Sequence, residues 1–292
     1  MIVVTTPTGS IGQAVVEDLL KRGETVRVIA RDPSRLASEL RGRIEVVEGS
    51  HGDLEVVNRA FQGADSVFWL VPPDPKANSV QAAYVDFSRP ACEAIRNHGV
   101  KRFVIVSALG RGWPADTGYV SASLAMDDLL MSTGVNCRVL TMPSFMDNLL
   151  RQVQAIKGQG MFFSPIAGDK KAPTCAVRDI ASVATRWLRD SSWTGQASVP
   201  VLGPEDLSCN DMAQIMSEVL AKPVRYQQIP FDAFKSRLTG FGMSEAMAQG
   251  MVAMMIAKNE GMDNVEPRTP EGTTPTSFRQ WCEEVLKPAV LH

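Results

Sequence analysis

The sequence predicts an α/β fold in which a doubly wound parallel sheet carries a smaller carboxy-terminal lobe. Apolar strand-length segments alternate with helix-length segments through the first half of the chain. At the very start, a short apolar strand runs into a glycine-bearing turn that opens a helix. Strands separated by helices imply βαβ units. Such units build a parallel sheet with helices on both faces.

The opening unit has a strand that begins at residue 2 and a helix that reaches residue 20. Ile11, Val15 and Leu19 recur at helical spacing and give this helix one buried face. Further apolar runs predict strands at residues 25–30, 44–47, 66–71, 103–106 and 137–140. Helices are expected between them, at residues 32–40, 53–61, 81–97 and 124–132.

Beyond about residue 150 the alternation loosens and helices prevail. They are expected at residues 178–188, 208–220, 231–239, 244–258 and 277–286, with one short strand at residues 224–227. Ser208 is the expected N-cap of the second of these helices. We therefore expect a sheet domain over residues 1–150 and a smaller mixed α/β lobe over residues 151–292, partly interleaved with the first.

The bulk composition limits the classes of partner. A formal net charge of −2 and an isoelectric point near 6.0 give no long-range attraction to nucleic acid or to an anionic membrane. No apolar run approaches the ~18–20 residues that a membrane helix needs. A strand that begins at residue 2 leaves no room for a signal peptide. The cysteines, at positions 92, 137, 175, 209 and 282, have no metal or thioredoxin spacing and fit a reducing cytoplasm.

The opening glycine turn is the strongest local signal of function. Gly9 and Gly12 let backbone N–H groups approach an anion closely, and the positive end of the helix points at the same place. A dinucleotide pyrophosphate is the usual occupant of such a turn. Thr6 stands where the full fingerprint has its first glycine, and a β-branched residue is expected to avoid positive φ, so the turn must be built differently. A tight turn without a ligand remains the alternative.

In an open parallel sheet, ligands bind outside the carboxyl ends of the strands. Six segments line that edge, starting at Thr6, Arg31, Gly52, Val71, Ser107 and Thr141. The three histidines, His51, His98 and His292, have no carboxylate or serine partner at a telling spacing. We therefore expect no metal site and no hydrolase triad.

The chain resembles the NmrA-like branch of the atypical short-chain dehydrogenases/reductases over nearly its whole length. The resemblance rests on ordered motifs: TPTGSIG, VRVIARDPSRL, EVVEGSHGDLEVVNRAFQGADSVFWL, VKRFVIVSA, DDLLMSTGVNCRVLTMPSFMDNLL, VRDIASVATRWL, VLGPEDLSCNDMAQIMSEVLAKPVRY and RTPEGTTPTSFRQW. It implies a Rossmann fold and a preference for NADP. It also implies one of two activities, reduction of small molecules or sensing of the cofactor's redox state with a regulatory protein partner.

The expected cofactor-binding residues follow the carboxyl edge of the sheet. They are Thr6, Thr8, Gly9, Ser10, Ile11, Gly12, Arg31, Asp53, Leu54, Val71, Pro72 and Ser107. At the end of the second strand, the Arg31 guanidinium can bind a 2′-phosphate bidentately, which favours NADP over NAD. Asp32 could instead accept a bond from a free 2′-hydroxyl, but Pro33 and Ser34 follow it, so we interpret it as a helix cap.

The remaining cofactor contacts depend on the resemblance and on loop position. The resemblance places Asp53 and Leu54 near the adenine, although an N-cap role for Asp53 is equally attractive. Val71 and Pro72 follow the fourth strand and are expected to wall the nicotinamide-side ribose, where two prolines in succession keep the loop rigid.

The resemblance also implies a catalytic arrangement that this chain only partly has. Short-chain dehydrogenases use a Ser to orient the carbonyl, a Tyr to pass the proton and a Lys four residues later. Ser107 and Tyr119 stand at the expected places, but Ser123 replaces the Lys. Without that ammonium, Tyr119 should keep a pKa near ~10 and act poorly as an acid or base at neutral pH.

Three explanations of the missing lysine stay open. The protein only binds NADP(H), or it reduces a substrate that needs hydride alone, or another group substitutes for the lysine. Weak candidates for such a group are Lys170, Lys171 and Asp179. The first two are interpreted mainly as a solvated turn, and Asp179 mainly as a helix cap.

The substrate side of the chain is apolar. Met243, Met247, Met251 and Met255 recur every four residues and form either core packing or a flexible pocket wall. The expected substrate contacts are Tyr119, Phe145, Met146, Met247 and Met251. We therefore predict an NADPH-dependent reductase of a small apolar or aromatic metabolite. The alternative is a non-catalytic NADP(H) redox sensor that acts through a protein partner.

Overall fold

A seven-stranded sheet forms the centre of the first of two units in the computed structural model, which describes residues 1–291. The strands are β1 (Ile2–Thr5), β2 (Val26–Ala30), β3 (Glu45–Glu48), β4 (Ser66–Trp69), β5 (Arg102–Ala108), β6 (Asn136–Met142) and β10 (Gln196–Pro200). Their order across the sheet is β10-β6-β5-β4-β1-β2-β3. β1 pairs in parallel with both β2 and β4, and the pairs β2–β3 and β4–β5 are also parallel. The predicted Rossmann fold is therefore confirmed.

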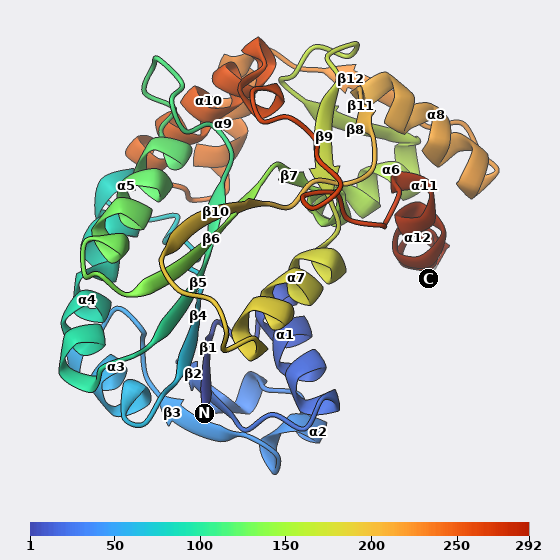
Figure 1. Ribbon diagram of the computed structural model, residues 1–292. Coiled ribbons are helices and arrows are strands. Elements are labelled where there is room, and N and C mark those ends of the chain that lie inside the picture. Colours follow the sequence, from blue (N-terminus) through green and yellow to red (C-terminus); the bar gives the residue numbers. More distant parts are fainter. Residues whose placement is uncertain (292) are drawn as a thin grey trace. The chain divides into compact units, whose positions relative to one another are not determined.

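Helices cover both faces of this sheet (Figure 1). The longer ones are α1 (Ser10–Lys21), α3 (Leu54–Phe61), α4 (Phe87–His98), α5 (Tyr119–Met131) and α7 (Val177–Arg189), and the short ones are η1 (Pro33–Arg35), α2 (Ser38–Arg41) and η2 (Ala82–Asp86). In Figure 1, α3, α4 and α5 lie on one side of the sheet, whereas α1 and α7 lie on the other. On the first side, Phe61, Trp69 and Phe103 form a fully buried aromatic cluster with ring centroids 5.7–6.4 Å apart.

Two features of this unit differ from the sequence-based expectation. The strand β10 was not predicted, because Gln196–Pro200 is mostly exposed at the edge of the sheet and has no apolar alternation. The helix expected over residues 81–97 begins as the π-helical turn η2. Pro90, inside α4, lacks an N–H and its ring would clash with the carbonyl four residues earlier, which accounts for the wider turn just before it.

The second unit consists of residues 109–120, 142–179 and 200–292. Its strands are β7 (Ser144–Phe145), β8 (Met161–Ser164), β9 (Ala172–Cys175), β11 (Asp206–Leu207) and β12 (Arg225–Gln228), which form a three-stranded sheet β11-β9-β7 and a parallel pair β12–β8. Its helices are η3 (Met146–Gln152), α6 (Val153–Gln159), α8 (Cys209–Leu220), α9 (Phe231–Gly240), α10 (Glu245–Glu260), η4 (Met262–Asn264), α11 (Phe278–Trp281), η5 (Cys282–Leu286) and α12 (Lys287–Leu291).

A separate apolar core holds the second unit together. Phe162, Met216, Phe278 and Trp281 are at its centre. Ser208 caps α8 in a reciprocal capping box with Asp211, as the sequence predicts.

The chain passes between the units more than once. The first unit takes residues 1–108, 121–141 and 180–199, whereas the sequence-based division set one boundary at residue 150 and allowed partial interleaving. Within the described part of the chain, no helix is both long enough and apolar enough to cross a membrane.

Candidate functional site

The turn between β1 and α1 holds a threonine in a backbone conformation that normally belongs to glycine. Thr6 has a φ of 53°, and its carbonyl oxygen accepts the Gly9 N–H at 3.1 Å. The expectation that a β-branched residue would avoid positive φ here was wrong. Such a conformation costs on the order of 1–2 kcal/mol, so the surrounding structure must impose it. Gly12 is part of the reason: a Cβ there would overlap the Thr6 carbonyl, so the helix approaches the turn closely only with glycine.

The amino-terminal end of α1 is open to an anion. Its N-cap, Gly9, provides no side-chain cap, and its first turn contains no acidic residue. The Thr6 hydroxyl oxygen is buried and has no hydrogen-bond partner within residues 1–291. Thr8 and Ser10 are exposed, whereas Ile11 is buried. Unsatisfied N–H groups, the helix dipole and a spare hydroxyl together fit a phosphate group at this end of the helix.

A cationic side chain follows β2. Arg31 is exposed at the end of β2. The neighbouring Asp32 is occupied, because its Oδ1 accepts bonds from the Ser34 N–H at 3.0 Å and the Ser34 hydroxyl at 2.6 Å. These bonds lower the pKa of Asp32. The interpretation of Asp32 as a cap is confirmed, and Arg31 is left as the available ligand for a sugar phosphate.

The loops after β3 and β4 lie at the same sheet edge. Asp53 caps α3, since its Oδ1 accepts bonds from the backbone N–H groups of Glu55 (2.9 Å) and Val56 (3.4 Å). Leu54 is half-buried. At the exit of β4, Val71 is buried and Pro72 is exposed. Both pairs lie where an elongated dinucleotide would run along the carboxyl edge of the sheet, and their contacts with it stay predictions.

Ser107, near the end of β5, forms a buried polar cluster with two residues of α5, Ser123 and Asp127. Its hydroxyl donates a hydrogen bond to Oδ2 of Asp127 and lies 3.3 Å from the Ser123 hydroxyl oxygen. All three side chains are buried, and Asp127 is completely so. Ser123 and Asp127 are four residues apart on one helix and therefore share a face. Ser123, which replaces the expected lysine, thus lies against Ser107. The Asp127 carboxylate, which was not predicted from the sequence, accepts the serine's hydrogen bond.

Tyr119 and the alternative acid–base groups belong to the second unit. Burial raises the pKa of Tyr119 to about 12, above the value near 10 expected from the sequence. Asp179 is not a cap: its carboxylate accepts bonds from the N–H (3.0 Å) and the hydroxyl (2.8 Å) of Thr276. Instead, Asp147 Oδ2 accepts the Val177 N–H at 3.0 Å, at the start of α7.

The paired lysines are in a solvated region, as interpreted from the sequence. Lys171 lies 3.7 Å from the Asp211 carboxylate. Lys170 and Lys171 line an open cavity of about 590 Å³ together with Ala167, Asp169, Glu260, Gly261 and Asn264. The lining includes two acidic residues and two lysines, so the cavity has no excess of either charge.

The expected substrate contacts differ in how much surface they keep. Met146 and Met247 are almost completely buried within the second unit. Phe145, in β7, and Met251, on α10, are half-buried. The four-residue methionine stripe therefore divides, with Met247 in the core and its later members partly accessible. The expected substrate roles stay predictions.

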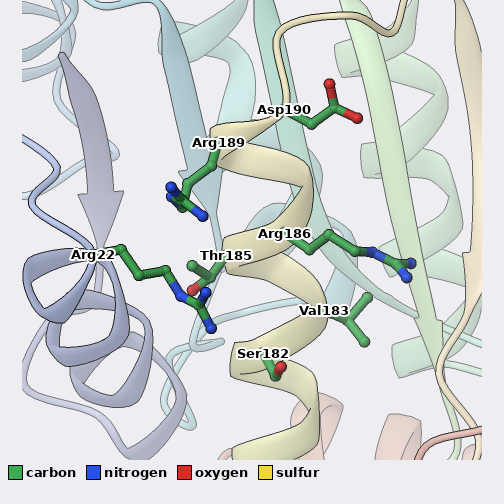
Figure 2. Close-up of a pocket in the computed structure, with 7 residues that line it drawn as sticks. All are labelled: Arg22, Ser182, Val183, Thr185, Arg186, Arg189 and Asp190. Atoms are coloured by element: carbon green, nitrogen blue, oxygen red, sulfur yellow. The ribbon is translucent and has the colours of Figure 1, made fainter.

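A second cavity, of about 490 Å³, lies between α1 and α7 at the opposite end of α1 from Gly9 (Figure 2). In Figure 2, Arg22 reaches from α1 towards α7, whereas Arg186 extends to the other side of α7. Arg22 pairs with Asp18 at 3.1 Å and Arg189 with Glu24 at 2.8 Å. Arg22 and Arg189 therefore already have carboxylate partners, and the helix carboxyl ends beside them do not attract an anion.

The histidines and the potential metal-ligating residues were also considered as functional groups. Among residues 1–291, no three His, Cys, Asp or Glu side chains come together as a metal would need. His51 is buried, His98 binds the Asn58 side chain at 3.1 Å, and His292 lies outside the described residues.

Comparison with known proteins gives one family. Residues 1–276 match the family model described as the NmrA-like family. An NAD(P)H azoreductase of Xenophilus azovorans is 31% identical over 253 residues, which cover 86% of this chain and 85% of the relative.

Two solved structures share the fold. A Citrobacter sp. triphenylmethane reductase complexed with NADP(H) superposes with a TM-score of 0.81 at 20% identity, over 99% of this chain and 100% of the other. An NADPH-dependent quinone oxidoreductase from Escherichia coli, complexed with NADPH, gives a TM-score of 0.78 at 22% identity, over 96% and 98%. At these identities the structural likeness concerns the fold alone.

Proposed function

Because the chain belongs to the NmrA-like family, we propose that it is an NADPH-dependent reductase that transfers hydride to a small aromatic electrophile. The observation that carries the proposal is the uncapped amino-terminal end of α1, where the Thr6 hydroxyl has no partner and Gly12 allows close approach. The related NAD(P)H azoreductase supports the reaction type.

The first unit has a group for each charged part of the cofactor. Backbone N–H groups of Ser10, Ile11 and Gly12 would bind the pyrophosphate, whereas the Gly9 N–H already donates to the Thr6 carbonyl. The Arg31 guanidinium would bind the 2′-phosphate in a charge-assisted, bidentate contact, which distinguishes NADPH from NADH. When bound, NADPH supplies a hydride to the substrate.

The buried serine cluster determines what kind of substrate suits this site. Ser107 has one hydroxyl proton, and that proton is already directed at Asp127. Ser107 can therefore accept a hydrogen bond but cannot polarise a substrate carbonyl by donating one. This limits the site to an electrophile that does not need a hydrogen bond from this serine.

Tyr119 is poorly suited to transfer a proton to the substrate. Burial raises its pKa to about 12, and Ser123 provides no ammonium to lower it. The proposed substrate is therefore an electron-poor conjugated system, such as a quinone, an azo compound or a dye cation. It accepts two electrons and one hydrogen as hydride, and any second proton that the product needs comes from water.

Two residues of the second unit are the proposed substrate contacts. Phe145 and Met251 keep accessible surface, whereas Met146 and Met247 pack in the interior of that unit. A polarizable thioether and an aromatic ring each suit contact with a flat apolar ligand. We also propose a cytoplasmic location, which the five free thiols support.

The alternative of a non-catalytic sensor is not favoured. The sensor hypothesis is based on Ser123 in place of the lysine, and a reduction that needs only hydride explains the same substitution. NADPH oxidation should be followed with a benzoquinone, an azo dye and a triphenylmethane dye as acceptors. Oxidation with at least one of them is expected. Tight NADPH binding without turnover of any would overturn the catalytic proposal and restore the sensor.

A further inference from the structure

We propose that His51 is a positioning residue that ties the loop after β3 to the exit of β4 and so sets the spacing between two cofactor-binding loops. The proposal rests on the proposed function, because those loops carry the predicted contacts Asp53, Leu54, Val71 and Pro72. His51 itself is buried and is not expected to touch the cofactor.

One hydrogen bond and two ring contacts hold the imidazole ring of His51. Its Nε2 lies 3.1 Å from the Leu70 carbonyl oxygen. Since a carbonyl can only accept, Nε2 carries the hydrogen and the ring is the Nε2–H tautomer. The ring also packs edge-on against Trp69 and Phe87, with centroid distances of 5.0 and 4.7 Å and interplanar angles of 83° and 80°. These contacts leave the side chain a single orientation.

Leu70 is held from a second direction. β4 ends at Trp69, so Leu70 lies just outside the sheet ladder. Its N–H donates to the Thr5 hydroxyl oxygen at 2.9 Å, and the same oxygen lies 3.1 Å from the Phe68 carbonyl. A side chain from β1 and the ring of His51 therefore fix the peptide that immediately precedes Val71.

The backbone that follows His51 in the loop after β3 is constrained as well. Gly52 follows His51, and a Cβ there would lie 2.6 Å from the Phe87 ring. The Asp53 N–H donates to the Ser50 carbonyl at 3.0 Å, and Asp53 then caps α3. A displacement of the His51 ring would therefore move the start of α3 together with Asp53. His51 connects the adenosine side of the proposed site to its nicotinamide side through one hydrogen bond.

The test uses variants that differ only in the Nε2 donor. In His51→Gln, the amide N–H₂ can reach the Leu70 carbonyl, whereas His51→Leu keeps bulk and loses the bond. His51→Leu should weaken NADPH binding about 5-fold, the effect of one lost neutral hydrogen bond, and His51→Gln should restore most of it. Binding of adenosine 2′,5′-bisphosphate, which occupies the adenosine side alone, should change less than about twofold in either variant. The KM for NADPH should rise with kcat unchanged at saturation.

Two controls make the result decisive. His98 makes a similar 3.1 Å contact, with Asn58, at the carboxyl end of α4, so His98→Leu should bind NADPH as the wild type does. If His51→Leu does not fold, Thr5→Val removes the other tie to Leu70 and should weaken NADPH binding in the same way. Wild-type affinity in both His51→Leu and Thr5→Val would overturn the proposal. Failure of the wild type itself to bind NADPH would instead overturn the proposed function.

Discussion

Acidification should destabilise this protein through His51, and the size of the effect follows from its burial. Burial lowers the pKa of His51 to about 4, and the nearby Arg31 charge acts in the same direction, while the bond to the Leu70 carbonyl opposes them. In the unfolded chain the pKa returns to about 6.5. Between these two values the unfolded state binds the extra proton, so stability is lost as the pH falls from about 6.5 to about 4.

The difference between a pKa of about 4 in the folded protein and about 6.5 in the unfolded chain corresponds to a loss of about 3 kcal/mol of unfolding free energy, once the pH is below both of these pKa values. At pH 4.5 roughly 2.5 kcal/mol of this should already be lost, whereas at pH 7 almost none is. Carboxylates also titrate in this range, but they do so alike in the wild type and in His51→Gln. The glutamine side chain of that variant has no group that takes up a proton in this pH range. The difference between the two proteins therefore isolates the histidine.

Urea unfolding followed by circular dichroism at pH 7 and pH 4.5 measures this difference. On acidification, the wild type should lose about 2–3 kcal/mol more unfolding free energy than His51→Gln does. Parallel losses in the two proteins would show that the ring is not buried in its neutral form, and the reasoning on its tautomer and its bond to Leu70 would fail with it.

Three further predictions concern the proposed site. Arg31→Ala should weaken NADPH binding by about 10–100-fold, since bonds to a charged group are lost, and leave NADH binding unchanged; an equal effect on both cofactors would refute a 2′-phosphate contact. Gly12→Ala should lower the free energy of unfolding by about 1–3 kcal/mol and abolish tight NADPH binding, because the added Cβ would overlap the Thr6 carbonyl. Gly42→Ala, where the added Cβ meets open space, is the control and should leave both the stability and the binding measured by calorimetry unchanged. Tyr119→Phe should reduce kcat less than about threefold; a loss of 100-fold or more would identify it as the proton donor.

The fold was predictable wherever side-chain periodicity and turn residues agree. β1 through β6 lie close to the expected ranges, because buried parallel strands are continuous apolar runs. The helix expected over residues 32–40 is instead the 3-10 turn η1 and the separate short helix α2, with extended backbone at Leu36 and Ala37 between them. β10 escaped prediction, since an exposed edge strand needs no apolar pattern. The helix at residues 277–286 was expected, but its middle is the π-helical turn η5 before Pro288, a local response to the ring.

The site was predictable only where it depends on backbone geometry. The glycine-bearing turn that opens α1 without a side-chain cap, and the Asp32 cap, followed from residue types at fixed spacing. The positive φ of Thr6 did not, because tertiary contacts override the preference of a β-branched residue. Asp127 could have been found, since it is four residues after Ser123 on one helix face.

The environment of His51 had no signal in the sequence. The ring is enclosed by Trp69 and Phe87, which are 18 and 36 positions away along the chain, and no spacing rule connects them. Because His51 has no carboxylate or serine partner at a telling spacing, the sequence indicates no role for it. Tertiary packing alone shows which carbonyl it binds.

An NMR titration of the ¹⁵N-labelled chain with NADPH tests the central claim most directly. The amide signals of Ser10, Ile11 and Gly12 should shift together at micromolar NADPH, because their N–H groups bind the pyrophosphate in the proposed complex. An absence of shifts at millimolar NADPH, or shifts confined to the Arg22–Arg189 cavity, would contradict the account.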